Sequence, residues 1–153
     1  MAENSLFEKI SALLQEDLPR ATKARAIVEA IRIEGSYRWA GLYDVDISVG
    51  MISNIAWSGV AAPEYPTFPV TQGLTSRAIS NKVTVNVGNV AEDPDYLTAL
   101  PTTRSEIIVP VIGPDRRVIG TLDVESEIPN AFDSERQRKL ENCGSLLTKF
   151  WNE

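Results

Sequence analysis

The chain of 153 residues contains no histidine and one cysteine, Cys143. Without histidine it lacks the commonest general base and metal ligand, and it cannot form a Ser-His or Cys-His nucleophile pair. A lone cysteine excludes an intramolecular disulfide, a thiolate zinc site and a two-thiol redox relay within the chain. Catalysis would therefore need carboxylates, Lys or Arg, hydroxyl groups or a borrowed cofactor. We expect no metal site and no resident cofactor.

Positive charge and long apolar runs are also scarce. The chain has 21 acidic and 15 basic residues, a net charge of −6. Because the basic residues do not cluster, we do not expect nucleic acid as a partner. No apolar run approaches the roughly 20 residues of a membrane span, and Met1 to Leu18 is an acidic amphipathic stretch unlike a targeting segment. We expect a cytoplasmic protein that does not bind membranes.

The length suits one domain, and we expect residues 1–153 to form a single α+β domain. Helical patterns occupy four segments: Asn4–Glu16, Ala21–Glu34, Gly73–Asn81 and Asp133–Trp151. Strand patterns occupy five: Arg38–Ile47, Met51–Trp57, Lys82–Val87, Ser105–Ile112 and Val118–Ser126. This order predicts a central antiparallel sheet with the N- and C-terminal helices packed on one face and a cavity on the other. Two irregular segments, the proline-containing Val60–Val70 and the connection Gly88–Thr103, are expected to close the cavity.

The hairpin formed by the last two predicted strands carries three acids and one arginine. An even-numbered loop centred on Pro114 and Asp115 would pair Glu106 with Asp123 and Arg104 with Glu125. Strand alternation then places these four residues on one face, together with Thr121. The opposite face is purely apolar and should carry the terminal helices: Ile107, Val109, Val111, Leu122 and Val124. Two carboxylates directly opposite each other are destabilising unless one holds a proton or a cation lies between them.

The residues alone leave two interpretations of this acidic face open. Glu106, Asp123 and Glu125 could line a cavity, or they could be solvated at a wet end of the sheet with Arg104 paired to Glu125. Three aromatic residues are equally compatible with core and cavity positions: Trp39, Tyr43 and Trp57. Cys143 lies on the apolar stripe of the last helix, so we expect it to be buried and unreactive.

Several segments resemble the GAF domain family. The resemblance is carried by Arg104–Val111, Val118–Ser126 and Ala131–Asp133 in the second half, and by Trp39–Tyr43, Gly73-Leu74 and Asp93–Tyr96 earlier. It covers nearly the whole chain. It implies a GAF/PAS-like fold, which agrees with the α+β architecture predicted from the pattern of helices and strands.

Among GAF proteins, the two strands of the acidic hairpin are most similar to the free methionine-R-sulfoxide reductases. In those enzymes, acids at the positions of Glu106, Asp123 and Glu125 line the substrate cavity, so the resemblance favours the cavity interpretation. The reductases also use cysteines before the first of these strands, in an earlier strand and in a mid-chain turn. This chain has no cysteine in the matching segments: Gly88–Thr103, Met51–Trp57 and Gly73-Leu74-Thr75-Ser76.

We therefore expect a GAF domain that binds a small molecule in a sensory or regulatory role without catalysis. Acids around the cavity favour an ammonium-bearing ligand such as an amino-acid derivative. The expected ligand-binding residues are Glu106, Asp123, Glu125, Arg104, Thr121, Trp39, Tyr43 and Trp57. One alternative is a sulfoxide reductase-like enzyme that uses an external thiol. Another is a dimerisation module with a filled pocket, and in either case the terminal helices favour a homodimer.

Overall fold

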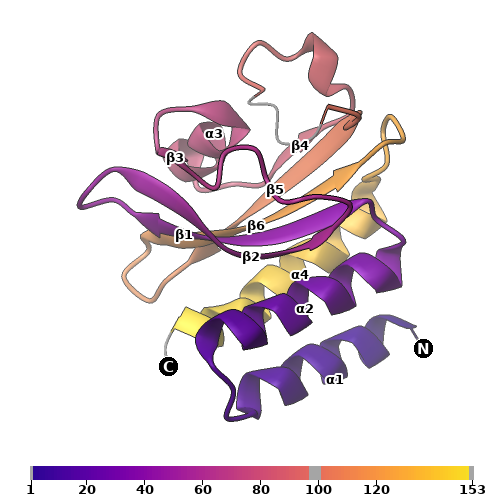
Figure 1. The fold of residues 1–153 in the computed structure, drawn as a ribbon, viewed down its shortest axis with the longest axis vertical. Helices are drawn as coiled ribbons and strands as arrows, with labels where there is room; N and C mark the ends of the chain where they lie inside the picture. Colours follow the sequence, from indigo (N-terminus) through magenta and orange to yellow (C-terminus); the bar gives the residue numbers. More distant parts are fainter. Residues whose placement is uncertain (1, 97–100, 152–153) are drawn as a thin grey trace.

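A six-stranded antiparallel sheet forms the centre of the fold (Figure 1). The computed structural model describes residues 2–96 and 101–151. The strands are β1 (Trp39–Asp46), β2 (Met51–Gly59), β3 (Thr67–Pro69), β4 (Val85–Val87), β5 (Ser105–Ile112) and β6 (Val118–Ser126). Their order across the sheet is β3-β2-β1-β6-β5-β4. The helices are α1 (Ala2–Gln15), α2 (Arg20–Gly35), α3 (Gly73–Asn81) and α4 (Ser134–Trp151), with a 3₁₀ turn η1 at Val90–Glu92. The predicted α+β class is confirmed.

The helices divide unevenly between the two faces of the sheet. The long helices α2 and α4 cover one face, α1 packs beneath them, and α3 lies on the opposite side near β4 and β5 (Figure 1). The apolar stripe of α1 is buried by this packing: Leu6, Ile10 and Leu14. Little of that stripe is therefore left exposed for a second copy to cover. None of the helices in the described ranges is long and apolar enough to cross a lipid bilayer.

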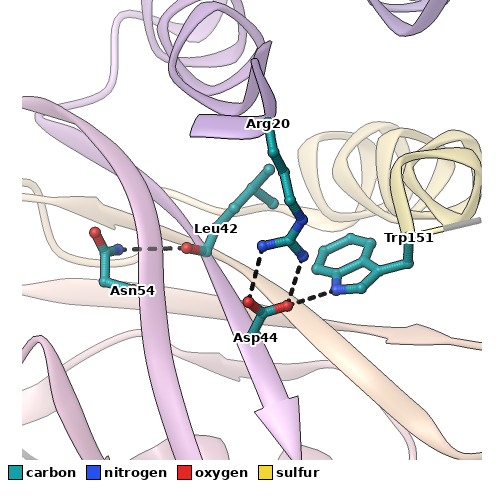
Figure 2. A network of polar contacts seen from close by, with 5 residues as sticks. All are labelled: Arg20, Leu42, Asp44, Asn54 and Trp151. Atoms are coloured by element: carbon teal, nitrogen blue, oxygen red, sulfur yellow. Dashed lines mark hydrogen bonds and ion pairs between the residues drawn. The ribbon is translucent and has the colours of Figure 1, made fainter. Parts of the chain in front are cut away.

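Side chains of β1 alternate between the two faces of the sheet. A β-bulge interrupts the pairing of β1 with β2. Ala40 and Leu42 join the core under the helices, whereas Trp39 and Tyr43 belong to a separate cluster on the other face. The register shifts between Leu42 and Tyr43, so that Ile55 has no direct partner on β1. Asn54 supports the bulge, since its amide Nδ2 donates to the carbonyl oxygen of Leu42 over 3.4 Å (Figure 2).

Asp44 joins three elements at one end of the sheet. Arg20, the first residue of α2, donates to both of its carboxylate oxygens at 2.9 and 2.7 Å. The indole Nε1 of Trp151, the last residue of α4, donates to Asp44 Oδ1 over 2.9 Å (Figure 2). The Trp151 ring lies so close to Gly120 that a Cβ there would come within 2.1 Å of it. A side chain at this position of β6 would displace the ring and with it the end of α4.

The predicted register of the β5–β6 hairpin is wrong by two residues. Glu106 pairs with Glu125 instead of Asp123, and Asp123 pairs with Ile108. One residue of the shift comes from a five-residue turn that is closed by a 2.8 Å bond from the Gly113 N–H to the Arg117 carbonyl. The other comes from the irregularity that follows, where Ile119 is the extra residue. Because the total shift is even, the three acids stay on the predicted face.

The three prolines of Val60–Val70 predict a loop, but part of this segment is a strand. Residues Thr67–Pro69 form the short edge strand β3, which pairs with Met51–Ser53 of β2. Proline is tolerated there because the free side of an edge strand needs no N–H donor. The strand fixes the end of the segment against the sheet, over the face that α2 and α4 leave uncovered.

Candidate functional site

A small cavity lies on the face of the sheet opposite α2 and α4. Its walls come from the sheet, from the segment before α3 and from the first turn of α3: Tyr43, Tyr65, Phe68, Gly73, Leu74, Thr75, Glu106, Asp123 and Glu125. The space open to the centre of a water molecule is about 30 Å³. That volume is far less than the several hundred Å³ of a typical drug-sized site.

Three carboxyl groups meet at this cavity and are almost completely buried. The exposed fractions are 7% for Glu106, 5% for Asp123 and 1% for Glu125. Thr103 Oγ1 donates to Glu125 Oε1 over 2.5 Å. Among the described residues, Glu106 Oε2 and Asp123 Oδ1 have no hydrogen-bond partner. Buried polar atoms are rarely left unpaired, so these two oxygens are suited to a partner from outside the chain.

Burial and mutual repulsion raise the pKa values of all three acids. Burial is the main cause of the raised pKa of Glu106, and the Glu125 and Asp123 carboxyls add to it. The pKa of Asp123 rises to about 8, chiefly through burial, although the nearby Thr121 hydroxyl lowers it slightly. Burial also raises the pKa of Glu125 to about 7, against opposing effects of the Thr103 hydroxyl and Arg38. At neutral pH, Asp123 therefore holds its proton.

The predicted site residues Tyr43 and Thr121 lie side by side on neighbouring strands. Tyr43 lines the cavity, and burial raises the pKa of its phenol, with further contributions from the three acids. Thr121 is fully buried but lies outside the cavity lining, and its Oγ1 makes no hydrogen bond of regular geometry with the described residues. Thr121 affects the site only by lowering the pKa of the neighbouring Asp123 carboxyl.

Three other predicted residues, Arg104, Trp39 and Trp57, lie outside the cavity. Arg104 is exposed and precedes β5. It does not pair with Glu125 as predicted, because Glu125 lies opposite Glu106. The Trp39 ring covers Gly41, where a Cβ would come within 2.4 Å of it, and its Nε1 donates to the Ala61 carbonyl over 3.0 Å. Trp57 is half-buried, with the guanidinium of Arg25 5.4 Å from the ring centre. Both indoles are therefore structural.

The sequence patterns missed the residues that close the cavity. Tyr65 and Phe68 come from the segment predicted to cover it, and they are the aromatic residues of that segment. The third wall is the first turn of α3, and none of the described residues of the predicted connection Gly88–Thr103 lines the cavity. Residues 97–100 of that connection lie outside the described residues. Gly73 begins α3 with a φ of +77°, a conformation that favours glycine, so the turn from β3 into α3 was readable from this residue.

Cys143 and the acids of the Asp93–Tyr96 segment lie away from the cavity. Cys143 is fully buried among the apolar residues between α4 and the sheet, so its expected burial is confirmed. Asp93 and Asp95 hold Arg77 of α3 at 2.6 and 3.8 Å. Within residues 2–96 and 101–151, no group of three or more His, Cys, Asp or Glu side chains has an arrangement that could hold a metal ion.

Comparisons with known proteins agree with the fold. The family model described as GAF domain matches residues 21–149. Protein YtsP of Bacillus subtilis is 23% identical over 145 residues, which cover 94% of this chain and 87% of that protein. The free methionine-R-sulfoxide reductase of Saccharomyces cerevisiae is 31% identical over 78 residues, 51% of this chain and 43% of the yeast enzyme. The X-ray structure of the free methionine-R-sulfoxide reductase from Neisseria meningitidis with its substrate has a TM-score of 0.88 at 25% identity, covering 98% of this chain and 88% of that one.

Proposed function

Because this chain belongs to the GAF domain family, we propose that it binds a small ammonium-bearing molecule in a sensory or regulatory role in the cytoplasm, without catalysis. An amino-acid derivative is the class of ligand that we expect. Glu106, Asp123 and Glu125 meet the positive charge, and Tyr43 forms a neighbouring wall.

One observation carries this proposal: Glu106 Oε2 and Asp123 Oδ1 are buried without a partner among the described residues. An ammonium group supplies N–H donors to such oxygens and a positive charge to a cavity that holds three acids. The metal alternative lacks support, since the described acids are not arranged as a metal site. The cavity is only about 30 Å³, so a whole amino acid requires the cover that carries Tyr65 to move outward.

The test compares two probes that differ in the ammonium group alone. L-methionine sulfoxide and its desamino analogue are titrated into the protein by calorimetry, in buffers of different ionisation enthalpy. We expect the amino compound to bind and to release protons, because a bound cation lowers the pKa of carboxyls that hold protons when the cavity is empty. Equal binding of the two probes, or binding without proton release, would contradict the proposal.

Two cavity variants and one surface variant separate charge at the site from charge elsewhere. E106Q and D123N remove an acid that lines the cavity and should weaken binding of the amino compound at least about tenfold. D115N removes the exposed acid of the β5–β6 turn, whose only described ion pair is with Arg117 at 3.4 Å. It should leave the affinity unchanged within about twofold.

A sulfoxide reductase-like enzyme is the second candidate function. Two observations favour it: the likeness to the Neisseria enzyme, and the Asp123 carboxyl, which at a pKa of about 8 keeps a proton at neutral pH that it can donate to a sulfoxide oxygen. The only cysteine of the chain, Cys143, is buried on the other face of the sheet. The reducing electrons must then come from an external thiol. Loss of methionine sulfoxide in the presence of dithiothreitol and catalytic amounts of protein would establish this candidate over the binding function.

A homodimer, expected through the terminal helices, is the third part of the proposal, and the exposed apolar surface that supports it lies between α1 and α2. Ile33 of α2 is exposed in a surface depression between α1 and α2, lined also by Leu6, Lys9 and Ala30. A second copy that packs on this depression would cover Ile33. Sedimentation at tens of micromolar should show a dimer that I33E dissociates, and a wild-type monomer would contradict it. If neither amine nor sulfoxide binds while the dimer forms, the domain is a dimerisation module with a filled pocket.

A further inference from the structure

Aromatic residues form part of the cavity lining beside the three acids. Tyr43, Tyr65 and Phe68 line the same space as the three carboxyls. The Tyr43 and Phe68 rings lie edge to face, with centroids 5.9 Å apart. Aromatic rings attract cations, and they pack well against methyl groups bound to a positively charged nitrogen. Carboxyls alone would suit any ammonium group, but rings beside them add a preference for N-methyl groups.

The unpaired oxygens limit how many methyl groups the nitrogen can carry. Glu106 Oε2 and Asp123 Oδ1 each need a donor, so the nitrogen must keep at least two N–H bonds. Ammonium, monomethylammonium and dimethylammonium satisfy this count. Trimethylammonium keeps one N–H and tetramethylammonium none, so these two would leave a buried oxygen unpaired at a substantial cost.

The volume leads to the same limit. The space open to the centre of a water molecule is about 30 Å³, far below that of a drug-sized site, so small cations fit it better than large ones. Each added methyl group takes up more of this space, and a cation that exceeds it requires an outward shift of Tyr65, which is 42% exposed. Four methyl groups do not fit without opening the cover.

Resting on the proposed function, we propose that the cavity selects a monomethyl- or dimethylammonium group over both unmethylated ammonium and quaternary ammonium. The carboxyl side binds the N–H bonds, and the aromatic side binds the methyl groups. The ligand class is thereby narrowed from amines in general to primary and secondary alkylammonium groups, of which monomethyl- and dimethylammonium are the smallest and which keep three or two N–H bonds.

The experiment titrates the chlorides of ammonium and of mono-, di-, tri- and tetramethylammonium, with sodium chloride holding the ionic strength constant. Binding is followed by the amide resonance of Gly73, which lines the cavity. We expect the highest affinity for the monomethyl or dimethyl cation, at least about threefold above both ammonium and tetramethylammonium.

A matched pair of variants tests the aromatic side. Y65L removes a ring from a partly exposed position, so the fold should be retained, and the preference for methylated cations should shrink. Y65F keeps the ring and should keep the preference. Equal affinities for ammonium and methylammonium, a higher affinity for tetramethylammonium, or an unchanged preference in Y65L would overturn this inference and leave the proposed function standing. If none of the five cations shifts the resonance, the proposed function itself fails and the inference falls with it.

Discussion

The two faces of β6 are both buried, but they are built from opposite chemistry. Leu122 and Val124 face α4 and α2 in a fully apolar core, whereas Asp123 and Glu125 face a small cavity with unpaired oxygens. Neighbouring residues of one strand thus belong to two environments only because their side chains alternate. The helix face contributes to the stability of the fold. The cavity face lowers the stability, because its buried acids are kept unpaired where a ligand can bind them. Substitutions of adjacent residues should therefore have effects of different size and sign.

The largest expected effect is on the helix face. L122A deletes most of a fully buried side chain and should lower the free energy of unfolding by about 3–5 kcal/mol, through lost burial and a residual cavity. Urea denaturation followed by tryptophan fluorescence measures this change. A loss below about 1 kcal/mol would show that the helix face is looser than its burial indicates.

The next effect is a pH dependence produced by the cavity face. Asp123 has a pKa of about 8 in the fold against 3.8 for the free side chain, and Glu125 about 7 against 4.5. Between these values the folded chain binds more protons than the unfolded chain, so stability is highest below about pH 4 for these groups and falls as the pH rises to about 8. At that upper pH, D123N should raise the free energy of unfolding by about 2–4 kcal/mol, because it removes a buried charge.

The control for this prediction is the same variant at low pH. Near pH 4 the Asp123 carboxyl is neutral in the fold, so D123N should change stability by less than about 1 kcal/mol. A chemical denaturation series across the pH range gives both numbers. A wild-type stability that rises steadily toward pH 8 would mean that the acids are ionised and paired.

Cys143 tests the helix face with a smaller change of chemistry. C143S places a hydroxyl in the apolar layer between α4 and the sheet and should cost about 1–3 kcal/mol. Binding at the cavity should not change. Labelling of the native protein by a thiol reagent should be slow, because the side chain is fully buried. Rapid labelling without denaturant would contradict this burial.

Most of the fold was predictable because its helices and strands have strong hydrophobic periods. The range of α3, Gly73–Asn81, and that of β5, Ser105–Ile112, are the same in the sequence pattern and in the structure. The register of β5 and β6 was not predictable, since it depends on the turn that closes at Gly113 and on the extra residue Ile119. Turn closure and bulges are set by local hydrogen bonds, which hydrophobic alternation does not encode.

The candidate site was predictable for the three acids and much less so for the residues around them. An even shift of register leaves the faces unchanged, so Glu106 and Asp123 reach the cavity despite the wrong pairing. The two indoles were ambiguous because a large ring packs equally well against a ligand or against a glycine, and Trp39 packs against Gly41. Tyr65 and Thr75 come from elements distant in sequence, and only the tertiary structure brings them to the acids.

The smallest predicted effect compares two threonines beside the acids. Thr121 is fully buried and its hydroxyl lacks a regular hydrogen bond within the described residues, whereas the Thr103 hydroxyl donates to Glu125. Valine keeps the shape of threonine and removes the hydroxyl. T121V should therefore raise the free energy of unfolding by about 1 kcal/mol, because an unsatisfied buried group is lost. T103V should lower it by about 1–2 kcal/mol, because Glu125 loses its donor.

Thermal denaturation at neutral pH measures both changes. Equal losses in the two variants would mean that Thr121 has a partner in solution, and that the cavity face is better satisfied than its geometry indicates.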